Sequence, residues 1–285
     1  MNKDERLNSG WVTETLNDQF KVSFKISETL FQEQSKYQEV RVVNSSGFGR
    51  ILLLDGMVMV SDRDEFIYHE MISHVPLFIH PDPKSVLIIG GGDGGTAREV
   101  CRHSQVSHCI MVEIDPLVIE VSKKYFPQTA LGFSHSKVQL KIEDGIKFVQ
   151  ETQEKFDIIL VDGSDPVGPA EGLFNFQFYQ QINNILKPDG IIVTQSESPF
   201  YQLKVQNDLA KIFSEIFPLN FLYTFSNLTY PGSLWTFLLA SKKYDPIKDF
   251  QTKKFKNFHG EFKYYNPMIH QASFCLPEFL KKHHE

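Results

Sequence analysis

From residue 85 to about residue 200, short apolar runs alternate regularly with segments of helical periodicity. The apolar runs predict buried strands, and they read SVLIIG, HCIMVEID, VQLKIEDG, FDIILVDG and IIVTQSES. Consecutive parallel strands need a crossover connection of a dozen or more residues, and helical segments supply it here. The repeated strand–helix unit therefore predicts an α/β fold with a mostly parallel, doubly wound sheet.

The C-terminal part of this region carries two further predictions. FNFQFYQQINNILKPDG predicts a helix that ends at the turn Pro188-Asp189-Gly190. LNFLYTF and SLWTFLLAS predict a closing pair of strands after one more helix, over roughly residues 201 to 217.

The pattern before residue 64 is different. Residues 20 to 60 alternate apolar and polar residues at period two, and Asp55-Gly56 between two apolar runs is a strong hairpin signal. This stretch predicts a small antiparallel sheet of five or six strands. Helical spacing begins near residue 64, where Asp64 is expected to cap a helix. We therefore expect an N-terminal β domain over residues 1–63 and a Rossmann-like domain over residues 64–285.

The composition argues against several classes of protein. The 285 residues are 41% hydrophobic and carry a formal net charge of −6, which is typical of a globular protein and argues against nucleic acid as a partner. No apolar run approaches the roughly 18 residues that a membrane span needs, and the polar N-terminus has no apolar signal segment. The three scattered cysteines give no disulfide framework. We expect a cytoplasmic protein without membrane contact.

Polar side chains follow five successive strands of the predicted sheet. They are Asp93, Glu113, Asp144, Asp162 and Gln195. In a doubly wound sheet, ligands bind beyond the carboxyl ends of the strands. Acids at four successive strand ends are better explained by one shared pocket than by chance.

The first of these strand ends is a glycine loop, in which Gly90, Gly92 and Gly95 fit GxGxxG. A dinucleotide-binding loop presents backbone N–H groups to a pyrophosphate, which Asp93 would repel. We interpret the loop as one that lets a nucleoside approach closely, with Asp93 facing a cation. Glu113 lies 18 residues after Gly95, where an acid usually binds ribose hydroxyls.

Two acids of the later strand ends leave alternatives open. Asp144 occupies a position that often takes an adenine amino group, but it could instead cap the following helix. In LVDGSDPVGPAEGLF, Asp162 and Asp165 can hold a diamine or serve as a base and an anchor. Asp165 could instead form an Asx-turn before Pro166. A Mg²⁺ site is a further alternative, although no His or third carboxylate is placed to complete one.

With these residues in view, the sequence resembles the spermidine synthase family of aminopropyltransferases. The ordered motifs that carry the resemblance are LLLDG, RDEFIYHEM, VLIIGGGDGGTAREV, MVEIDP, DGSDPVGPAEGLF, TYPGSLWTF and YYNPMIH, from about residue 10 to 280. The resemblance implies a methyltransferase-like Rossmann domain behind a small β domain that serves oligomerisation and part of the acceptor site. It implies decarboxylated S-adenosylmethionine as the co-substrate, no other cofactor or metal, and putrescine as the acceptor. Spermidine and methylthioadenosine would be the products. The resemblance also implies a homodimer or homotetramer.

The resemblance also assigns roles to individual residues. The nucleoside donor site would consist of Gln38, His69, Asp93, Glu113, Asp144, Gly145 and Pro169. The diamine site would consist of Tyr68, Asp162, Asp165, Gln195, Tyr230 and, packed over it, Trp11. Asp162 would accept a proton from the attacking amine, and Tyr68 would orient that amine. Typical members of the family read DGVVQ where this chain reads DGMVM, so Met59 either packs in place of a Gln or changes the ligand preference.

Several other functions are compatible with the sequence. An N-methyltransferase on the same scaffold would use S-adenosylmethionine itself, whose carboxylate Asp93 disfavours. Other members of the family would use agmatine or spermidine as the acceptor. A catalytically silent polyamine binder and an NAD-dependent dehydrogenase are the remaining alternatives.

Overall fold

The computed structural model describes residues 10–17, 19–164 and 172–281. The N-terminal strands are β1 (Gly10–Asn17), β2 (Phe20–Ile26), β3 (Glu28–Gln34), β4 (Glu39–Ser45), β5 (Gly49–Leu54) and β6 (Met57–Ser61). The strands of the second part are β7 (Ser85–Gly90), β8 (His108–Glu113), β9 (Val138–Ile142), β10 (Phe156–Asp162), β11 (Leu186–Gln195), β12 (Leu219–Ser226) and β13 (Leu234–Ser241). The helices are α1 (Glu65–Ile79), α2 (Gly95–Cys101), α3 (Pro116–Tyr125), α4 (Pro127–Ala130), α5 (Gly145–Glu151), α6 (Phe176–Ile185), α7 (Leu203–Ile216), α8 (Thr252–Lys256), α9 (Pro267–Ser273) and α10 (Glu278–Lys281), with a 3-10 turn at Leu131–Ser134.

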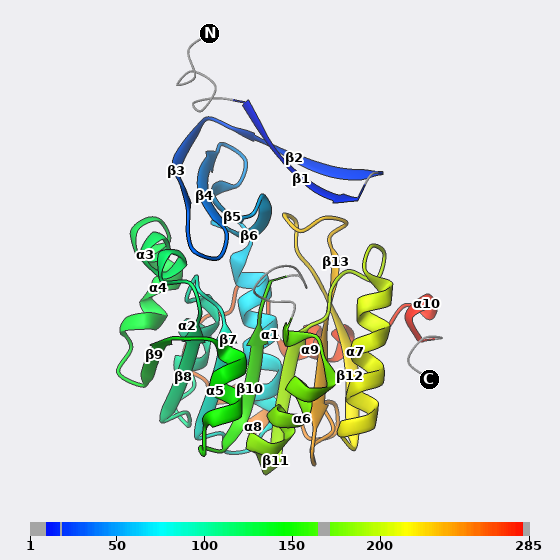
Figure 1. Cartoon of the computed structure of the whole chain (residues 1–285). Helices are drawn as coiled ribbons and strands as arrows, with labels where there is room; N and C mark the ends of the chain where they lie inside the picture. The colour runs from blue at the N-terminus through cyan, green and yellow to red at the C-terminus, as the bar shows by residue number, and fades with distance from the viewer. Residues whose placement is uncertain (1–9, 18, 165–171, 282–285) are drawn as a thin grey trace.

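The predicted antiparallel β region is confirmed, but its six strands form two sheets, β1-β2 and β3-β4-β5-β6, and not the single sheet that was predicted (Figure 1). Asp55 and Gly56 both have positive φ, +48° and +83°, as the predicted hairpin between β5 and β6 requires. β1 begins ten residues before the predicted β region. The sequence did not predict this strand because GWVTETLN carries few apolar residues. Its pairing with β2 brings it into the fold.

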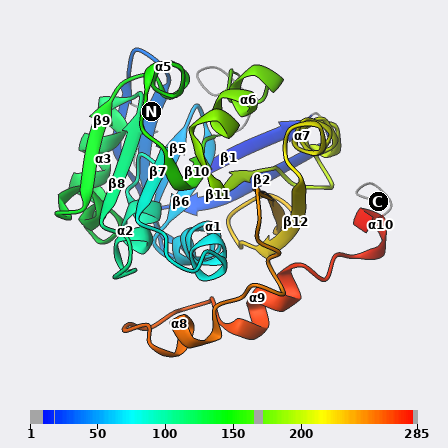
Figure 2. The ribbon, with the colours of Figure 1, turned by 90° about the horizontal axis from the view of Figure 1, so that it is seen from below.

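The second part is a seven-stranded sheet with the order β12-β13-β11-β10-β7-β8-β9. All neighbouring strands from β11 to β9 run parallel, as the sequence predicts. The predicted closing pair is β12 and β13, and β13 runs antiparallel to both β11 and β12. Figure 2 shows α5, α6 and α7 over one face, and α1, α2 and the C-terminal helices α8 and α9 over the other. Each face buries its own apolar cluster. The strand order reverses between β7 and β10, and this reversal positions the site described below.

Two predictions at helix ends are wrong. The helix predicted to run to Pro188-Asp189-Gly190 ends at Ile185, and Leu186 already pairs with Phe156 in the sheet. The exposed carbonyls at this helix end are satisfied by Lys242, whose Nζ donates to Asn183 and Leu186.

Asp64 precedes α1 but makes no side-chain capping bond. Its carboxylate instead accepts hydrogen bonds from the amide and the hydroxyl of Thr229, at 2.8 and 3.0 Å. A buried carboxylate needs strong donors, and the Thr229 loop supplies them. Asp64 therefore ties the start of α1 to the segment that carries Tyr230.

Among the helices that the structure describes, none has the length and apolarity needed to span a bilayer. The three cysteines are free thiols; Cys101 and Cys109 are buried and Cys275 is exposed.

Candidate active site

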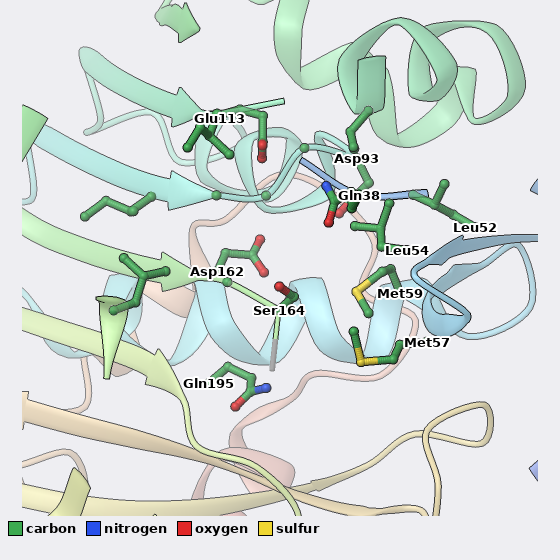
Figure 3. A pocket seen from close by; sticks show the side chains of 18 of the residues that line it. Gln38, Leu52, Leu54, Met57, Met59, Asp93, Glu113, Asp162, Ser164 and Gln195 are labelled. Carbon is green, nitrogen blue, oxygen red and sulfur yellow. The ribbon is translucent and has the colours of Figure 1, made fainter. Parts of the chain in front are cut away.

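A cavity lies where the C-terminal ends of β7, β8, β9 and β10 face the N-terminal sheets (Figure 3). The loops that follow β7 and β10 leave in opposite directions, and a crevice at such a reversal is the usual ligand position in this architecture. The predicted residues that line the cavity are Gln38, Tyr68, His69, Asp93, Glu113, Asp144, Gly145, Asp162, Gln195 and Tyr230. The structure thus brings the strand-end acids into one pocket.

The glycine loop after β7 lies directly against Asp162. Gly90 and Gly91 have φ of +84° and +75°, and Gly91 N donates to the Asp162 carbonyl at 2.9 Å. A Cβ on Gly90 would lie 2.2 Å from that carbonyl oxygen, and one on Gly91 would lie 2.8 Å from Asp162 Oδ2. Glycine is therefore required twice over, by backbone conformation and by the close approach to Asp162.

The carboxylate of Asp162 is held by two hydroxyl donors. Tyr68 Oη donates to Oδ1 at 2.8 Å, and Thr96 Oγ1 donates to Oδ2 at 2.6 Å. Burial, and then the charge of Asp93, raise the pKa of Asp162 above its usual value. Burial and Asp162 in turn raise the pKa of Tyr68 well above 10, so this phenol stays a neutral donor. A carboxylate with a raised pKa is a better proton acceptor than an ordinary surface Asp.

Asp93 lies in the glycine loop and lines the same cavity. Its Oδ1 accepts from Gly95 N at 2.7 Å and lies 3.0 Å from His69 Nε2. Asp93 and Asp162 are close enough for each charge to affect the cavity, so a cationic ligand is favoured between them.

Glu113 ends β8 and is buried at the cavity wall. Its Oε1 accepts from Asp115 N at 2.9 Å. Burial raises the pKa of Glu113 to about 7, although the backbone bond from Asp115 opposes this. A partly desolvated carboxyl group of this kind is suited to hydroxyl donors such as those of a ribose, which add no charge to the site.

Asp144 and Gln38 complete this side of the cavity. Asp144 Oδ1 accepts from the amides of Ile146 and Lys147, so the alternative of a helix cap is realised, while the residue also lines the cavity. Gln38 lies just before β4, and its Nε2 donates to Asp115 Oδ2 at 3.1 Å. This bond fixes the orientation of the Gln38 amide.

The opposite side of the cavity is more apolar. Figure 3 shows the side chains of Met57 and Met59 pointing into the cavity, across from Asp162. Tyr230 Oη donates to the Met59 carbonyl at 2.9 Å, which ties the Tyr230 loop to β6. Gln195 is fixed by Glu197, whose amide donates to Gln195 Oε1 at 2.7 Å. Met59 is therefore a lining residue, and its thioether stands where a Gln would offer hydrogen bonds.

Trp11 is not one of the described residues that line the cavity, although the resemblance predicted that it would pack over the diamine site. Successive side chains of β1 point to opposite faces, and Val12 and Glu14 take the buried face. Trp11 is consequently 65% exposed in the single chain.

The sequence analysis did not identify three polar residues of the site, namely Glu14, Thr96 and Ser164. Glu14 is a buried acid that lines the cavity, and its Oε2 accepts from Val58 N at 2.9 Å. Period-two alternation in GWVTETLN places Glu14 on the same face as Val12, which was the available signal. Thr96 was missed because one hydroxyl at the start of a helix is indistinguishable from an ordinary first-turn residue.

Asp165 and Pro169 lie outside the residues that the structure describes, so their predicted roles stay predictions.

One group of possible metal ligands within the described ranges comprises His80, Asp157 and Asp189. Asp157 lies at the start of β10, whereas Asp162 lies at its end, so this group is remote from the cavity. His80 Nδ1 accepts from Asp82 N at 3.2 Å, which places the ring proton on Nε2. A protonated Nε2 has no lone pair for a metal, and it lies 3.9 Å from a carboxylate oxygen of each of Asp157 and Asp189.

Comparison with known proteins assigns the chain to a family. Residues 65–254 match the model described as "Spermine/spermidine synthase domain", and residues 10–62 match the one described as "Spermidine synthase tetramerisation domain". A protein of Thermoanaerobacter pseudethanolicus named polyamine aminopropyltransferase is 47% identical over 271 residues, covering 95% of this chain and 97% of its own. The protein of the same name from Bacillus cytotoxicus is 45% identical with the same coverage.

Solved structures agree with this result. A spermidine synthase crystallised with the transition state analogue AdoDATO superposes with a TM-score of 0.94 at 40% identity, covering 98% of this chain and 97% of its own. Spermidine synthase from Thermotoga maritima superposes with a TM-score of 0.91 at 38% identity, covering 98% and 96%. The chain therefore belongs to the spermine/spermidine synthase family and is an enzyme of that family.

Proposed function

We propose that the protein transfers the aminopropyl group of decarboxylated S-adenosylmethionine to putrescine, giving spermidine and methylthioadenosine. One observation carries the proposal: Asp162, held by Tyr68 and Thr96, lies between the acidic side of the cavity and its apolar side. A proton acceptor at this junction is adjacent to both reactants.

The acidic side fits the donor. Glu113 would bind the ribose hydroxyls, Asp144 with Gly145 would face the adenine, and Asp93 would pair with the ammonium of the aminopropyl arm. The carboxylate of intact S-adenosylmethionine would meet the negative charge of Asp93, which disfavours the methyl donor. Gln38 and His69, together with Pro169, would complete the donor site.

The apolar side fits a diamine. The methylene chain would lie along Met57 and Met59, near Tyr230 and Gln195. Asp165 is proposed to pair with the far ammonium. If Asp165 pairs with the far ammonium, the two carboxylates would select a ligand with cationic ends and an uncharged middle.

The main chemical difficulty is the attacking amine. An alkyl ammonium has a pKa of about 10.4, so only about one molecule in 10³ is neutral at pH 7, which costs on the order of 4 to 5 kcal/mol. Asp162 would accept this proton, aided by the raised pKa that burial gives it. Tyr68, a neutral phenol, would orient the nitrogen, which then displaces the sulfonium in line. Because the sulfonium is already a good leaving group, we propose that no cofactor or metal is needed.

We further propose a cytoplasmic homo-oligomer assembled through the N-terminal strands. The match of residues 10–62 to a tetramerisation model supports this, and so does the exposure of Trp11 in the single chain. Large exposed aromatic side chains are enriched at protein interfaces.

A product assay by mass spectrometry tests the proposal. The pure protein is incubated with putrescine and with either decarboxylated or intact S-adenosylmethionine. Spermidine and methylthioadenosine from the decarboxylated donor alone are expected. N-methylputrescine from the intact donor would instead assign a methyltransferase, and cadaverine, agmatine and spermidine as acceptors would define the chain length that the site accepts.

A further inference from the structure

A row of buried charges runs from Asp93 through His69 and Glu65 to Arg98, and His69 also lines the cavity. His69 bridges two carboxylates, with Nδ1 at 2.5 Å from Glu65 Oε2 and Nε2 at 3.0 Å from Asp93 Oδ1. The side chains of His69 and Glu65 are only 2% and 8% exposed. Because both ring nitrogens face carboxylate oxygens, the ring binds both only when both nitrogens carry protons.

Arg98 of α2 fixes Glu65 from behind. Its two terminal nitrogens lie 3.1 and 2.9 Å from Glu65 Oε1 and Oε2, in a bidentate pair. Its Nε donates to Glu99 at 2.8 Å, so the guanidinium is itself held at a third point. Neither oxygen of Glu65 is thus left to rotate toward another partner.

The imidazole of His69 has no room to move. A Cβ on Gly95 would lie 2.3 Å from its ring, which therefore packs flat against the start of α2. The ring also contacts Tyr68 edge to face, with centroids 5.7 Å apart. Packing and the Glu65 bond together set the direction of Nε2.

The charges facing His69 favour its protonated form. Glu65 of its own helix and Asp93 of the glycine loop bind it directly, Asp162 of β10 lies nearby, and Tyr68 is neutral. Arg98 reaches it only through Glu65. Desolvation lowers the pKa of His69, but Asp93 and Glu65 outweigh it and raise this pKa to about 10.

We propose that Glu65, clamped by Arg98, is a positioning residue for the aminopropyl donor that acts through His69. The His69 ring holds Oδ1 of Asp93, which also accepts from Gly95 N. Every hydrogen bond to the Asp93 carboxylate within the described parts of the chain is made to Oδ1. Oδ2 is thereby directed to the donor's ammonium. This role rests on the proposed function, because it assumes a donor with an ammonium group.

The test is Glu65→Gln, which keeps the shape of the side chain but removes one of the two negative charges that face His69. The pKa of His69 must then fall, and above the new value the ring is neutral, so its hydrogen bond to the Asp93 carboxylate is no longer strengthened by a positive charge. The KM for decarboxylated S-adenosylmethionine, relative to wild type, is expected to rise by at least about threefold between pH 7 and pH 9. The kcat at saturating donor is expected to change little. Glu151→Gln, at an exposed i,i+4 pair with Lys147, is the matched control.

A second readout separates this role from general damage to the site. Methylthioadenosine lacks the aminopropyl ammonium, so its Kd by calorimetry is expected to be the same in Glu65→Gln and wild type. A KM ratio that stays constant from pH 7 to pH 9, or an equal loss of methylthioadenosine affinity, would overturn the proposal.

Nitrogen NMR of the His69 ring in the wild-type protein covers two other cases. If Glu65→Gln fails to fold, a ring that carries both protons at pH 8 supports the proposal and a neutral ring overturns it. If the wild type forms no aminopropylated product, the proposed function fails. A comparison of the His69 ring in the wild type and in Glu65→Gln then still shows whether Glu65 keeps the ring charged.

Discussion

Oη of Tyr68 and Oδ1 of Asp162 lie 2.8 Å apart, and this bond joins a helix of one face to the end of a central strand. Tyr68 belongs to α1, which follows the N-terminal strands directly, whereas Asp162 ends β10. The bond therefore fixes α1, the helix that follows the N-terminal strands, against the strand that carries the proposed proton acceptor.

Tyr68→Phe is expected to lower kcat by about 10- to 100-fold, since a hydrogen bond to a charged group is lost. Burial raises the pKa of Asp162 and the Tyr68 bond lowers it, so removing the bond raises this pKa further. The ionised form of Asp162 is then lost at a higher pH. The acidic limb of the kcat/KM profile should move to higher pH, and a limb that stays in place would contradict the assignment of that limb to Asp162.

Gly91→Ala is expected to lower kcat at least tenfold. Its Cβ would lie 2.8 Å from Asp162 Oδ2 and displace that carboxylate from its productive position, where about 1 Å matters. The positive φ also costs about 1 to 2 kcal/mol of stability. Gly56→Ala is the matched control, since Gly56 has a similar φ of +83° but open space around a Cβ. Both variants should lose similar stability, and equal kcat in the two would contradict the steric argument.

Thr229→Val is expected to lower the free energy of unfolding by about 1 to 3 kcal/mol, because Asp64 loses a hydroxyl donor while buried. Thr229 precedes Tyr230, so the KM for the diamine should rise more than the KM for the donor. Urea unfolding and steady-state kinetics check the two parts. Thr252→Val, at an exposed position, should change stability by no more than about 0.5 kcal/mol. If both KM values changed equally, Thr229 would not be the residue that positions Tyr230 for the diamine.

The buried His270 makes stability depend on pH. Tyr265 Oη donates to its Nδ1, and its Nε2 donates to the Pro246 carbonyl, so the neutral ring is fully bonded. Burial lowers its pKa to about 4, below the usual 6.5. The unfolded chain therefore binds the proton first, and stability is lost as the pH falls from about 6.5 to about 4, by up to roughly 3 kcal/mol.

His270→Gln cannot take up this proton. Its stability should be lower than that of the wild type at pH 7 but should fall less steeply between pH 6.5 and pH 4. Urea unfolding at several pH values measures the slope. Identical slopes in the two proteins would show that another group is responsible.

The residues that follow the parallel strands were predictable as neighbours because their position in the sheet alone brings them together. Asp93, Glu113, Asp144 and Asp162 end successive parallel strands, and parallel strands deliver their ends to one edge of the sheet. Gln195 follows the same rule. The shared cavity was accordingly predictable from spacing.

The rest depended on contacts between distant segments. Glu14 enters the cavity from β1, a strand whose own pattern is weak, and Trp11 faces the other way by the same alternation. The carboxylate of Asp64 makes no capping bond because it accepts from Thr229, which lies 165 residues away in the sequence. The helix before β11 ended early because Leu186 pairs with Phe156. The partners in these contacts are far apart in the sequence, so a local hydrophobic pattern could not predict them.

The most direct test of the account is the kcat of Asp162→Asn with putrescine and decarboxylated S-adenosylmethionine. Asn keeps the shape and still accepts the Tyr68 bond, but it cannot accept the amine's proton. The account predicts a kcat lower by about 10²–10⁴, the usual loss for a general base, with methylthioadenosine affinity retained. An unchanged kcat would contradict the central role of Asp162.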